Sequence, residues 1–146
     1  MKYVIFSIFS IILLFINFLF IGEIYSFITP FFILPIRYYK LISILIFLFV
    51  EISIFLVYKN NFFDKRLSII LSINYLFFIL YNYFSFYLVN TFLMLSIKIL
   101  QFISSLYLNE DICSKNKISA NLLVPYILWT FYLTLISISI FFLNNN

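Results

Sequence analysis

Two ionisable residues, Glu51 and Lys98, lie inside long apolar stretches of this sequence, where charged side chains are rare and usually functional. Their opposite signs suit an ion pair between two helices, or an ion or proton site in a membrane protein. In a helical arrangement Glu51 lies about 9 Å deeper than Lys98 from the face at which both helices start, at about 1.5 Å per residue. Two interpretations therefore stay open: an ion pair, or a lysine that snorkels alone beside a protonated or cavity-facing glutamate.

A second distinctive group opens the last apolar run, where residues 122–132 read LLVPYILWTFY. Tyr126 and Trp129, the only tryptophan, are three residues apart, so they project from one face of a helix. Pro125 is expected within the first two turns of that helix, where its missing N–H costs least. By themselves, these aromatic residues indicate an interfacial aromatic belt.

The residue types that are missing exclude most catalytic chemistry. With no His and one Cys, the chain cannot form a His-ligated metal or haem site, a Ser-His-Asp or Cys-His relay, or an internal disulfide. We therefore predict that it is not an enzyme and holds no resident metal or cofactor. Apart from Lys98, its basic residues are scattered at the ends of apolar runs, so we predict no nucleic-acid partner.

The elements that position these residues are predicted to be membrane-spanning helices. The sequence is 66% hydrophobic, well above the roughly half-apolar composition of soluble domains. A bilayer core about 30 Å thick needs about 20 apolar residues of helix. Five runs qualify, at about residues 3–21, 38–58, 67–88, 91–108 and 119–143. We expect an all-α integral membrane protein whose residues 1–146 form one five-helix transmembrane domain, with a tight hairpin near residue 90 and a solvated connector at 109–117.

The basic residues at the ends of these runs favour one orientation. In a five-span chain, one face carries Lys2, Lys59, Lys65, Arg66, Lys115 and Lys117, and the other carries Arg37 and Lys40. Because cytoplasmic loops are enriched in Lys and Arg, the N-terminus is predicted on the cytoplasmic side and the C-terminus on the other.

Polar residues within the runs predict which helix faces contact other helices. Asn74, Phe78 and Asn82 share one stripe of the third run at four-residue spacing. An amide in hydrocarbon needs a partner, so this stripe is expected to face neighbouring helices. With one Gly in the chain, close helix packing is expected to rely on the serines of the spans.

The last run resembles the final helix of the translocator protein family, also called tryptophan-rich sensory proteins or peripheral benzodiazepine receptors. That helix typically reads LL-x-PYL-x-W and closes with LN. The matching residues here are Leu122, Leu123, Pro125, Tyr126, Trp129, Leu143 and Asn144.

Other segments are similar to the same family. Pro30 and Pro35 match the first and last prolines of an element in the family's first loop, with Phe32 in place of its Trp. Residues 56–59, LVYK, match the LVW-K-like end of the second helix. In the third helix, Tyr75 and Asn82 match the pattern LY-x-x-QL-x-x-N. Ser43 and Ser85 stand where the family usually has Trp, and no basic residue follows Lys117 to complete the cholesterol motif of animal members.

The resemblance implies a five-helix bundle, a homodimer, and a binding function. Family members bind flat or polycyclic apolar ligands, including porphyrins and sterols, in a cavity inside the bundle that the first loop covers. By position, the resemblance implies ligand contacts from Ser43, Phe47, Tyr75, Asn82, Tyr126, Trp129, Leu133 and Ile136, with Pro30 and Pro35 stiffening the lid. The expected partners are thus the lipid bilayer and a tetrapyrrole- or sterol-like molecule, which the protein transports or senses.

A different class of function also fits the sequence. A small membrane transporter or structural subunit would use Glu51 and Lys98 as an ion site or an assembly contact. Loss of transport in Glu51→Gln, without any porphyrin binding, would favour that alternative.

Overall fold

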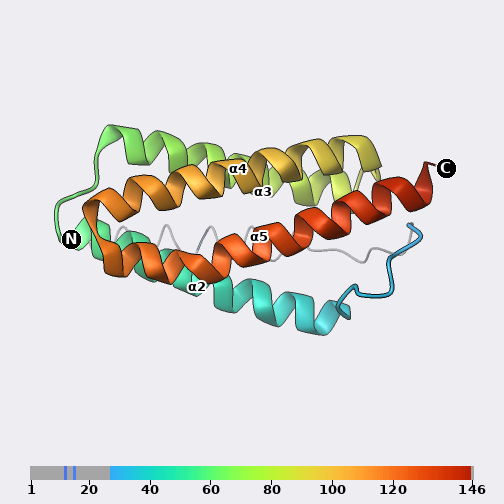
Figure 1. Cartoon of the computed structure of the whole chain (residues 1–146), viewed down its shortest axis with the longest axis horizontal. Coiled ribbons are helices and arrows are strands. Elements are labelled where there is room, and N and C mark those ends of the chain that lie inside the picture. Colours follow the sequence, from blue (N-terminus) through green and yellow to red (C-terminus); the bar gives the residue numbers. More distant parts are fainter. Residues whose placement is uncertain (1–11, 13–14, 16–26, 146) are drawn as a thin grey trace.

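A computed structural model describes residues 12, 15 and 27–145 of the 146-residue chain. Within this part it forms four long helices: α2 (Ile36–Lys59), α3 (Lys65–Phe86), α4 (Thr91–Lys115) and α5 (Lys117–Asn144) (Figure 1). All four are long and apolar enough to cross a membrane, in agreement with the predicted all-α membrane protein. Apart from residues 12 and 15, the first predicted helix, at about 3–21, lies outside the described residues.

The predicted end of the fourth helix is wrong. It was expected at about residue 108, with a solvated connector at 109–117, but α4 continues to Lys115. The polar residues expected to break it form its last turns, because the buried carboxylate of Asp111 pairs with Arg66 and Lys115. The connector shrinks to Asn116, which ends α4 and caps α5 by accepting hydrogen bonds from the Ile118 and Ser119 amides.

The expected position of Pro125 also needs correction. Because α5 begins at Lys117, two residues before the predicted start, Pro125 lies in the interior of the helix rather than in its opening turns. A proline there cannot donate to the carbonyl of Asn121, four residues earlier. Asn121 is exposed, and on that side the unpaired carbonyl can be solvated.

The predicted tight hairpin between the third and fourth helices is present. Val89 adopts a left-handed backbone conformation with φ of 50°, and the Asn90 side chain accepts a hydrogen bond of 2.9 Å from the Leu93 amide to start α4. Asp64 plays the same capping part for α3, accepting a 2.8 Å bond from Leu67 N–H. Both caps satisfy amides that have no partner within their own helices.

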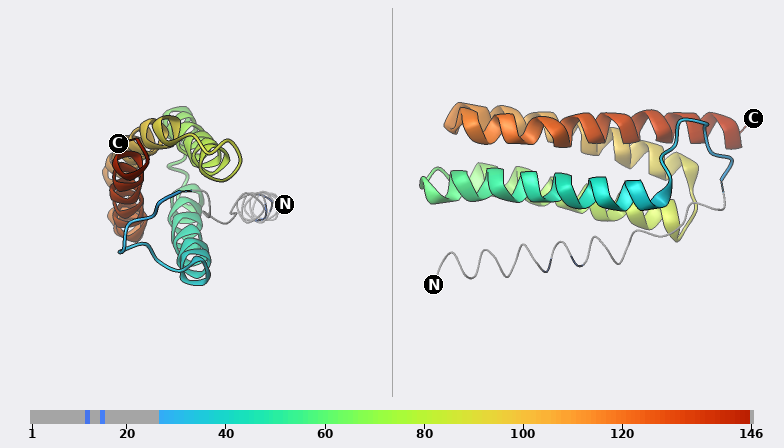
Figure 2. Two further views of the ribbon diagram at one scale, coloured as in Figure 1. Left: turned by 90° about the vertical axis from the view of Figure 1, so that its right-hand side faces the viewer. Right: turned by 90° about the horizontal axis from the view of Figure 1, so that it is seen from below.

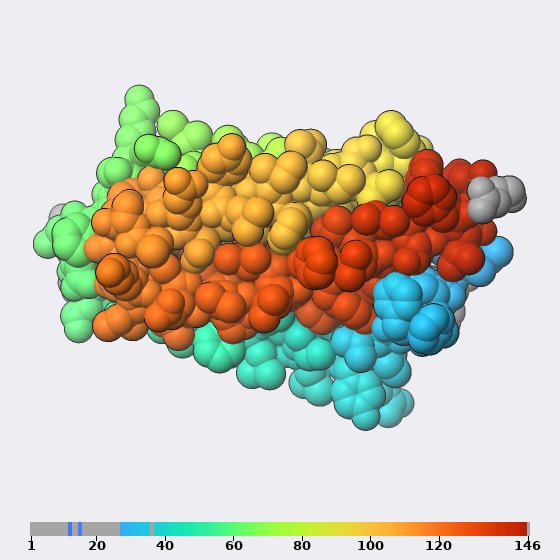
Figure 3. Space-filling view, viewed as in Figure 1, coloured from blue at the N-terminus to red at the C-terminus, as the bar shows by residue number. Residues whose placement is uncertain are grey.

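Viewed end-on, the four helices follow one another around an arc in the order α2, α5, α4, α3 (Figure 2). The α4 and α5 side chains pack along most of their length, and the segment before α2 lies against the C-terminal part of α5 (Figure 3). Small hydroxyl residues lie between α4 and α5, where Ser105 and Thr130 are 3.3 Å apart. Ser104 and Ser105 therefore contribute to helix packing as the sequence predicted, whereas Ser72, Ser96 and Ser139 are bonded only within their own helices.

The ends of the helices separate basic residues as the orientation prediction requires. Five described basic residues lie where α2 and α4 end and α3 and α5 begin: Lys59, Lys65, Arg66, Lys115 and Lys117. Arg37 and Lys40 lie at the opposite end, near the start of α2. We call these two ends the basic end and the lid end.

Cys113, which is exposed at the basic end, tests this orientation without an engineered probe. A membrane-impermeant maleimide is expected to label it in intact cells only after permeabilisation, because the positive-inside rule places this end in the cytoplasm. A Cys113→Ser variant that carries Asn145→Cys at the lid end should be labelled in intact cells without permeabilisation. Labelling of Cys113 in intact cells would invert the assigned orientation.

Candidate ligand-binding site

Four residues of α5, spaced along one stripe, form what we call the α5 wall: Tyr126, Trp129, Leu133 and Ile136. All four are buried, and Trp129 is 9% exposed. The indole of Trp129 lies 5.4 Å from the ring of Tyr39 on α2 and stacks on the ring of Tyr132 at 5.3 Å. The tryptophan thus faces the interior of the bundle rather than the lipid, unlike a residue of an interfacial belt.

The hydroxyl of Tyr126 connects three helices. It donates a hydrogen bond to Oδ1 of Asn74 on α3 and accepts one of 3.3 Å from Nε2 of Gln101 on α4. Asn74 in turn donates a 2.7 Å bond to the hydroxyl of Ser104 on α4. The polar stripe of α3 therefore faces its neighbours, and the buried amide has partners on both sides.

The predicted site residues of α2 and α3 meet across the bundle. Phe47 and Tyr75 are half-buried, with ring centroids 6.4 Å apart, and the Tyr75 hydroxyl donates a 2.6 Å hydrogen bond to Oε1 of Glu51. Ser43, one helical turn before Phe47, is also half-buried.

Asn82, the remaining predicted ligand contact, has an unusual environment. Its side chain is 0% exposed, and neither its amide nitrogen nor its amide oxygen has a hydrogen-bond partner. A buried amide without partners costs roughly 1–3 kcal/mol for each unsatisfied group. A polar group of a bound molecule would remove that cost.

The segment before α2, residues 27–35, is the predicted lid, and two side chains of α5 hold it in place. The Tyr132 hydroxyl donates to the carbonyl of Phe32 at 3.0 Å and accepts from the amide of Leu34 at 3.2 Å. Asn144 accepts from the Ile28 amide at 2.9 Å and donates to the Ile28 carbonyl at 3.0 Å. Pro30 is buried within the lid, whereas Pro35 is exposed and directly precedes α2.

The two intramembrane charges have different partners. Lys98 donates a 2.8 Å hydrogen bond to Oε1 of Gln101, and its ammonium lies 4.0 Å from the ring centroid of Tyr81. Glu51 accepts from Tyr75 instead. The ion pair left open by the sequence therefore does not form. The alternative of a snorkelling lysine is also wrong, because Lys98 is 0% exposed and is bonded to Gln101 within the protein.

Sequence reasoning missed Gln101, the residue that joins Lys98 to Tyr126. A signal for it was available, because buried residues of α4 recur at alternating four- and three-residue steps: Met94, Lys98, Gln101, Ser105 and Leu108. That spacing is typical of one inward helix face. The polar members of the stripe mark the interior as clearly as the apolar ones.

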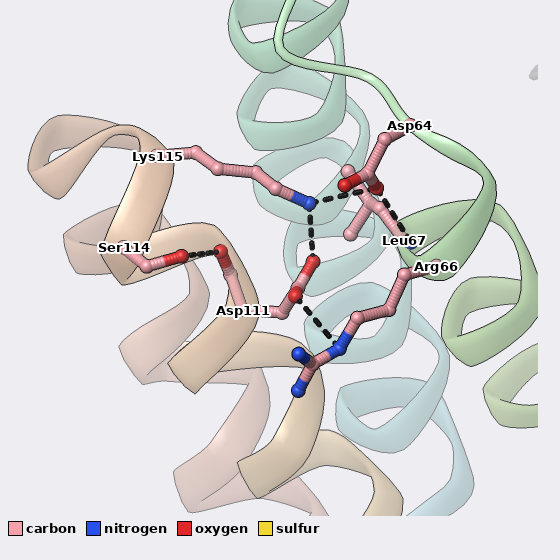
Figure 4. Close-up of polar contacts among 6 residues, drawn as sticks. All are labelled: Asp64, Arg66, Leu67, Asp111, Ser114 and Lys115. Carbon is pink, nitrogen blue, oxygen red and sulfur yellow. Dashed lines mark hydrogen bonds and ion pairs between the residues drawn. The ribbon is translucent and has the colours of Figure 1, made fainter.

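A cluster of four charged residues ties α3 to the end of α4 at the basic end (Figure 4). Asp111 accepts from Nε of Arg66 at 3.2 Å and from Nζ of Lys115 at 2.5 Å, and Lys115 also contacts Asp64 at 2.8 Å. The hydrogen bonds from Lys115 and from the Leu67 amide hold the pKa of Asp64 below its usual value. The stability that Asp64 contributes is thus present at neutral pH and is lost as the pH falls through that lowered pKa.

Replacing Asp111 with alanine is expected to lower the free energy of unfolding by about 1–2 kcal/mol, because Arg66 and Lys115 lose their shared acceptor. Unfolding of the purified protein in detergent, followed by circular dichroism, measures the change. Glu110→Ala removes an exposed carboxylate from the adjacent position and should leave stability nearly unchanged. Equal losses in the two variants would show that Asp111 has no special part.

Comparison with known proteins agrees with the fold of membrane-spanning helices described above. No curated protein sequence matches the chain. The sequence model of the TspO/MBR family matches residues 4–143, which covers nearly all of the predicted first span, the predicted lid and the four described helices. This assignment also agrees with the prediction that the protein is not an enzyme. Because the match covers nearly the whole sequence, the chain is a multi-pass integral membrane protein of the TspO/MBR family.

Proposed function

We propose that this protein binds porphyrin- or sterol-like apolar molecules inside the membrane, against the α5 wall and beneath the lid, and transports or senses them. One observation carries the proposal: Trp129 faces inward and stacks on Tyr132, the residue whose hydroxyl is bonded to the lid. The stacked rings of Trp129 and Tyr132 thereby connect the α5 wall to the lid. The homodimer implied by family resemblance stays a prediction.

The chemistry of the α5 wall suits such ligands. Burial of apolar surface contributes about 25 cal/mol per Å², so a large flat molecule gains most of its affinity from aromatic and aliphatic walls. A few polar groups then set its orientation, and Asn82 offers an amide without partners. The rival ion-site function is less favoured, because Glu51 and Lys98 each have other partners.

Fluorescence of Trp129, the only indole, tests the proposal. Titration of the purified full-length protein in lipid nanodiscs with protoporphyrin IX or cholesterol should quench or shift this emission with saturation at a defined stoichiometry. Unsaturable quenching, equal to that of free tryptophan in the same nanodiscs, would reject the site.

Loosening the lid is expected to speed ligand release. Tyr132→Phe keeps the ring that stacks on Trp129 but removes the hydroxyl that bonds Phe32 and Leu34. Loss of these two bonds should raise the dissociation rate of protoporphyrin IX about threefold to tenfold. Stopped-flow displacement measures that rate, and Asn144→Ala should act in the same direction.

The control for the lid is Ser139→Ala. Ser139 lies on α5 near Asn144 but donates only to the carbonyl of Leu135 within its own helix. Its removal should leave the dissociation rate unchanged. If Tyr132→Phe behaves like Ser139→Ala, the segment at residues 27–35 does not retain the ligand.

A further inference from the structure

We propose that the ligand carries an acidic group, a carboxylate on a large apolar skeleton, and that Lys98 is the residue that neutralises it. This inference rests on the proposed function and deepens it, because it selects acidic ligands over neutral ones. The inference comes from the surroundings of Lys98, because an apolar ligand wall does not explain a buried ammonium.

Lys98 is 0% exposed, and the two groups that its ammonium contacts are neutral. The contacts of its Nζ are the amide oxygen of Gln101 at 2.8 Å and the face of the Tyr81 ring at 4.0 Å. The three ion pairs of the cluster at the basic end do not include Lys98. The carboxylate of Glu51 is bonded to Tyr75 on another pair of helices.

An ammonium in this position lacks a compensating charge. Moving a charged group out of water costs several kcal/mol, and neutral acceptors recover only part of that cost. A carboxylate from outside the protein would supply both the opposite charge and a strong acceptor. Charge-assisted hydrogen bonds of this kind are roughly twice as strong as neutral ones.

The position of Lys98 relative to the α5 wall makes it suitable for this task. Gln101 accepts from Lys98 through its oxygen and donates to the hydroxyl of Tyr126 through its nitrogen. One side chain therefore separates the ammonium from the first residue of the wall. A ligand whose apolar body lies along Tyr126 and Trp129 could direct its acid toward Lys98.

The chemistry of the Lys98 side chain also selects the ligand. An ammonium has three donors and no acceptor, so it is suited to a carboxylate and poorly suited to the single hydroxyl of a neutral sterol. Lys98 thus favours acids such as tetrapyrrole propionates over neutral polycyclic molecules.

Matched acid and neutral probes test the inference on the full-length protein in nanodiscs. Trp129 fluorescence is titrated with protoporphyrin IX and its dimethyl ester, and with cholesteryl hemisuccinate and its methyl ester, so that skeleton and charge vary separately. The acid of at least one pair is expected to bind at least about tenfold more tightly than its ester. Equal affinities within both pairs would overturn the role of Lys98 and leave the proposed function standing. If no probe binds at all, both proposals are overturned.

Substitution of Lys98 assigns the preference to this residue. Lys98→Gln should abolish the preference for the acid, and Lys98→Arg, which keeps the charge, should retain it. Lys117→Gln removes a lysine at the exposed start of α5 and serves as the matched control, with the preference unchanged. A preference that survives in folded Lys98→Gln would overturn the assignment. If Lys98→Gln does not fold, the affinities of acid and ester for the parent protein and for Lys98→Arg still test the inference.

Discussion

Replacing Trp129 with alanine is expected to weaken protoporphyrin IX binding about tenfold to a hundredfold, the largest effect of any single substitution on affinity. The indole presents a large apolar face to the interior, and losing its contact with the ligand removes roughly 1.5–3 kcal/mol of binding free energy. Tyr39 and Tyr132, the two rings that pack on it, would also lose their support.

The measurement is the shift of the porphyrin absorbance band on binding, because the substitution removes the fluorescent probe itself. Leu128→Ala is the matched control, since Leu128 is the adjacent residue of α5 but is 62% exposed on the outer face. That variant should bind with the affinity of the parent. Equal affinities for all three proteins would exclude the α5 wall as the site.

Substitution of Asn74 with alanine is expected to cause the largest loss of stability, about 2–3 kcal/mol. Asn74 bonds both Tyr126 and Ser104, so its removal leaves two buried hydroxyl groups without these partners and opens a small gap among three helices. Unfolding in detergent, followed by circular dichroism, measures the change.

Ser72→Ala provides the control for Asn74. Ser72 is an exposed residue of the same helix, and its hydroxyl donates only to the carbonyl of Ser68 one turn earlier. Its removal should change stability by less than about 0.5 kcal/mol. If Asn74→Ala proves equally mild, the polar network does not hold α3, α4 and α5 together.

Much of the architecture followed from hydropathy because the bilayer allows few alternatives. A run of about 20 apolar residues must form a helix to satisfy its backbone, so α2, α3 and α5 could be placed closely from the sequence. The end of α4 could not. Residues 109–111 read as a loop until Arg66, which is distant in the sequence, is known to pair with Asp111 together with the nearby Lys115.

The site was predictable only in part. The spacing of Tyr126 and Trp129 showed that they share a face, but one sequence could not show whether that face meets lipid or protein; the contacts with Tyr39 and Asn74 decide this. The sequence left the pairing of Glu51 with Lys98 open, because helix tilt and the long lysine side chain could close their depth offset of about 9 Å. The intervening packing of α5 between α2 and α4 gives each charge a separate set of neighbours.

The central claim is that the indole of Trp129 faces the bundle interior, where a ligand binds. Its most direct test is quenching of Trp129 emission by lipids brominated in their acyl chains, compared with a Trp129→Phe protein that carries Leu128→Trp. The inward indole should be quenched far less than the outward indole at residue 128. Equal quenching of the two proteins would place Trp129 against the acyl chains and contradict the proposed site.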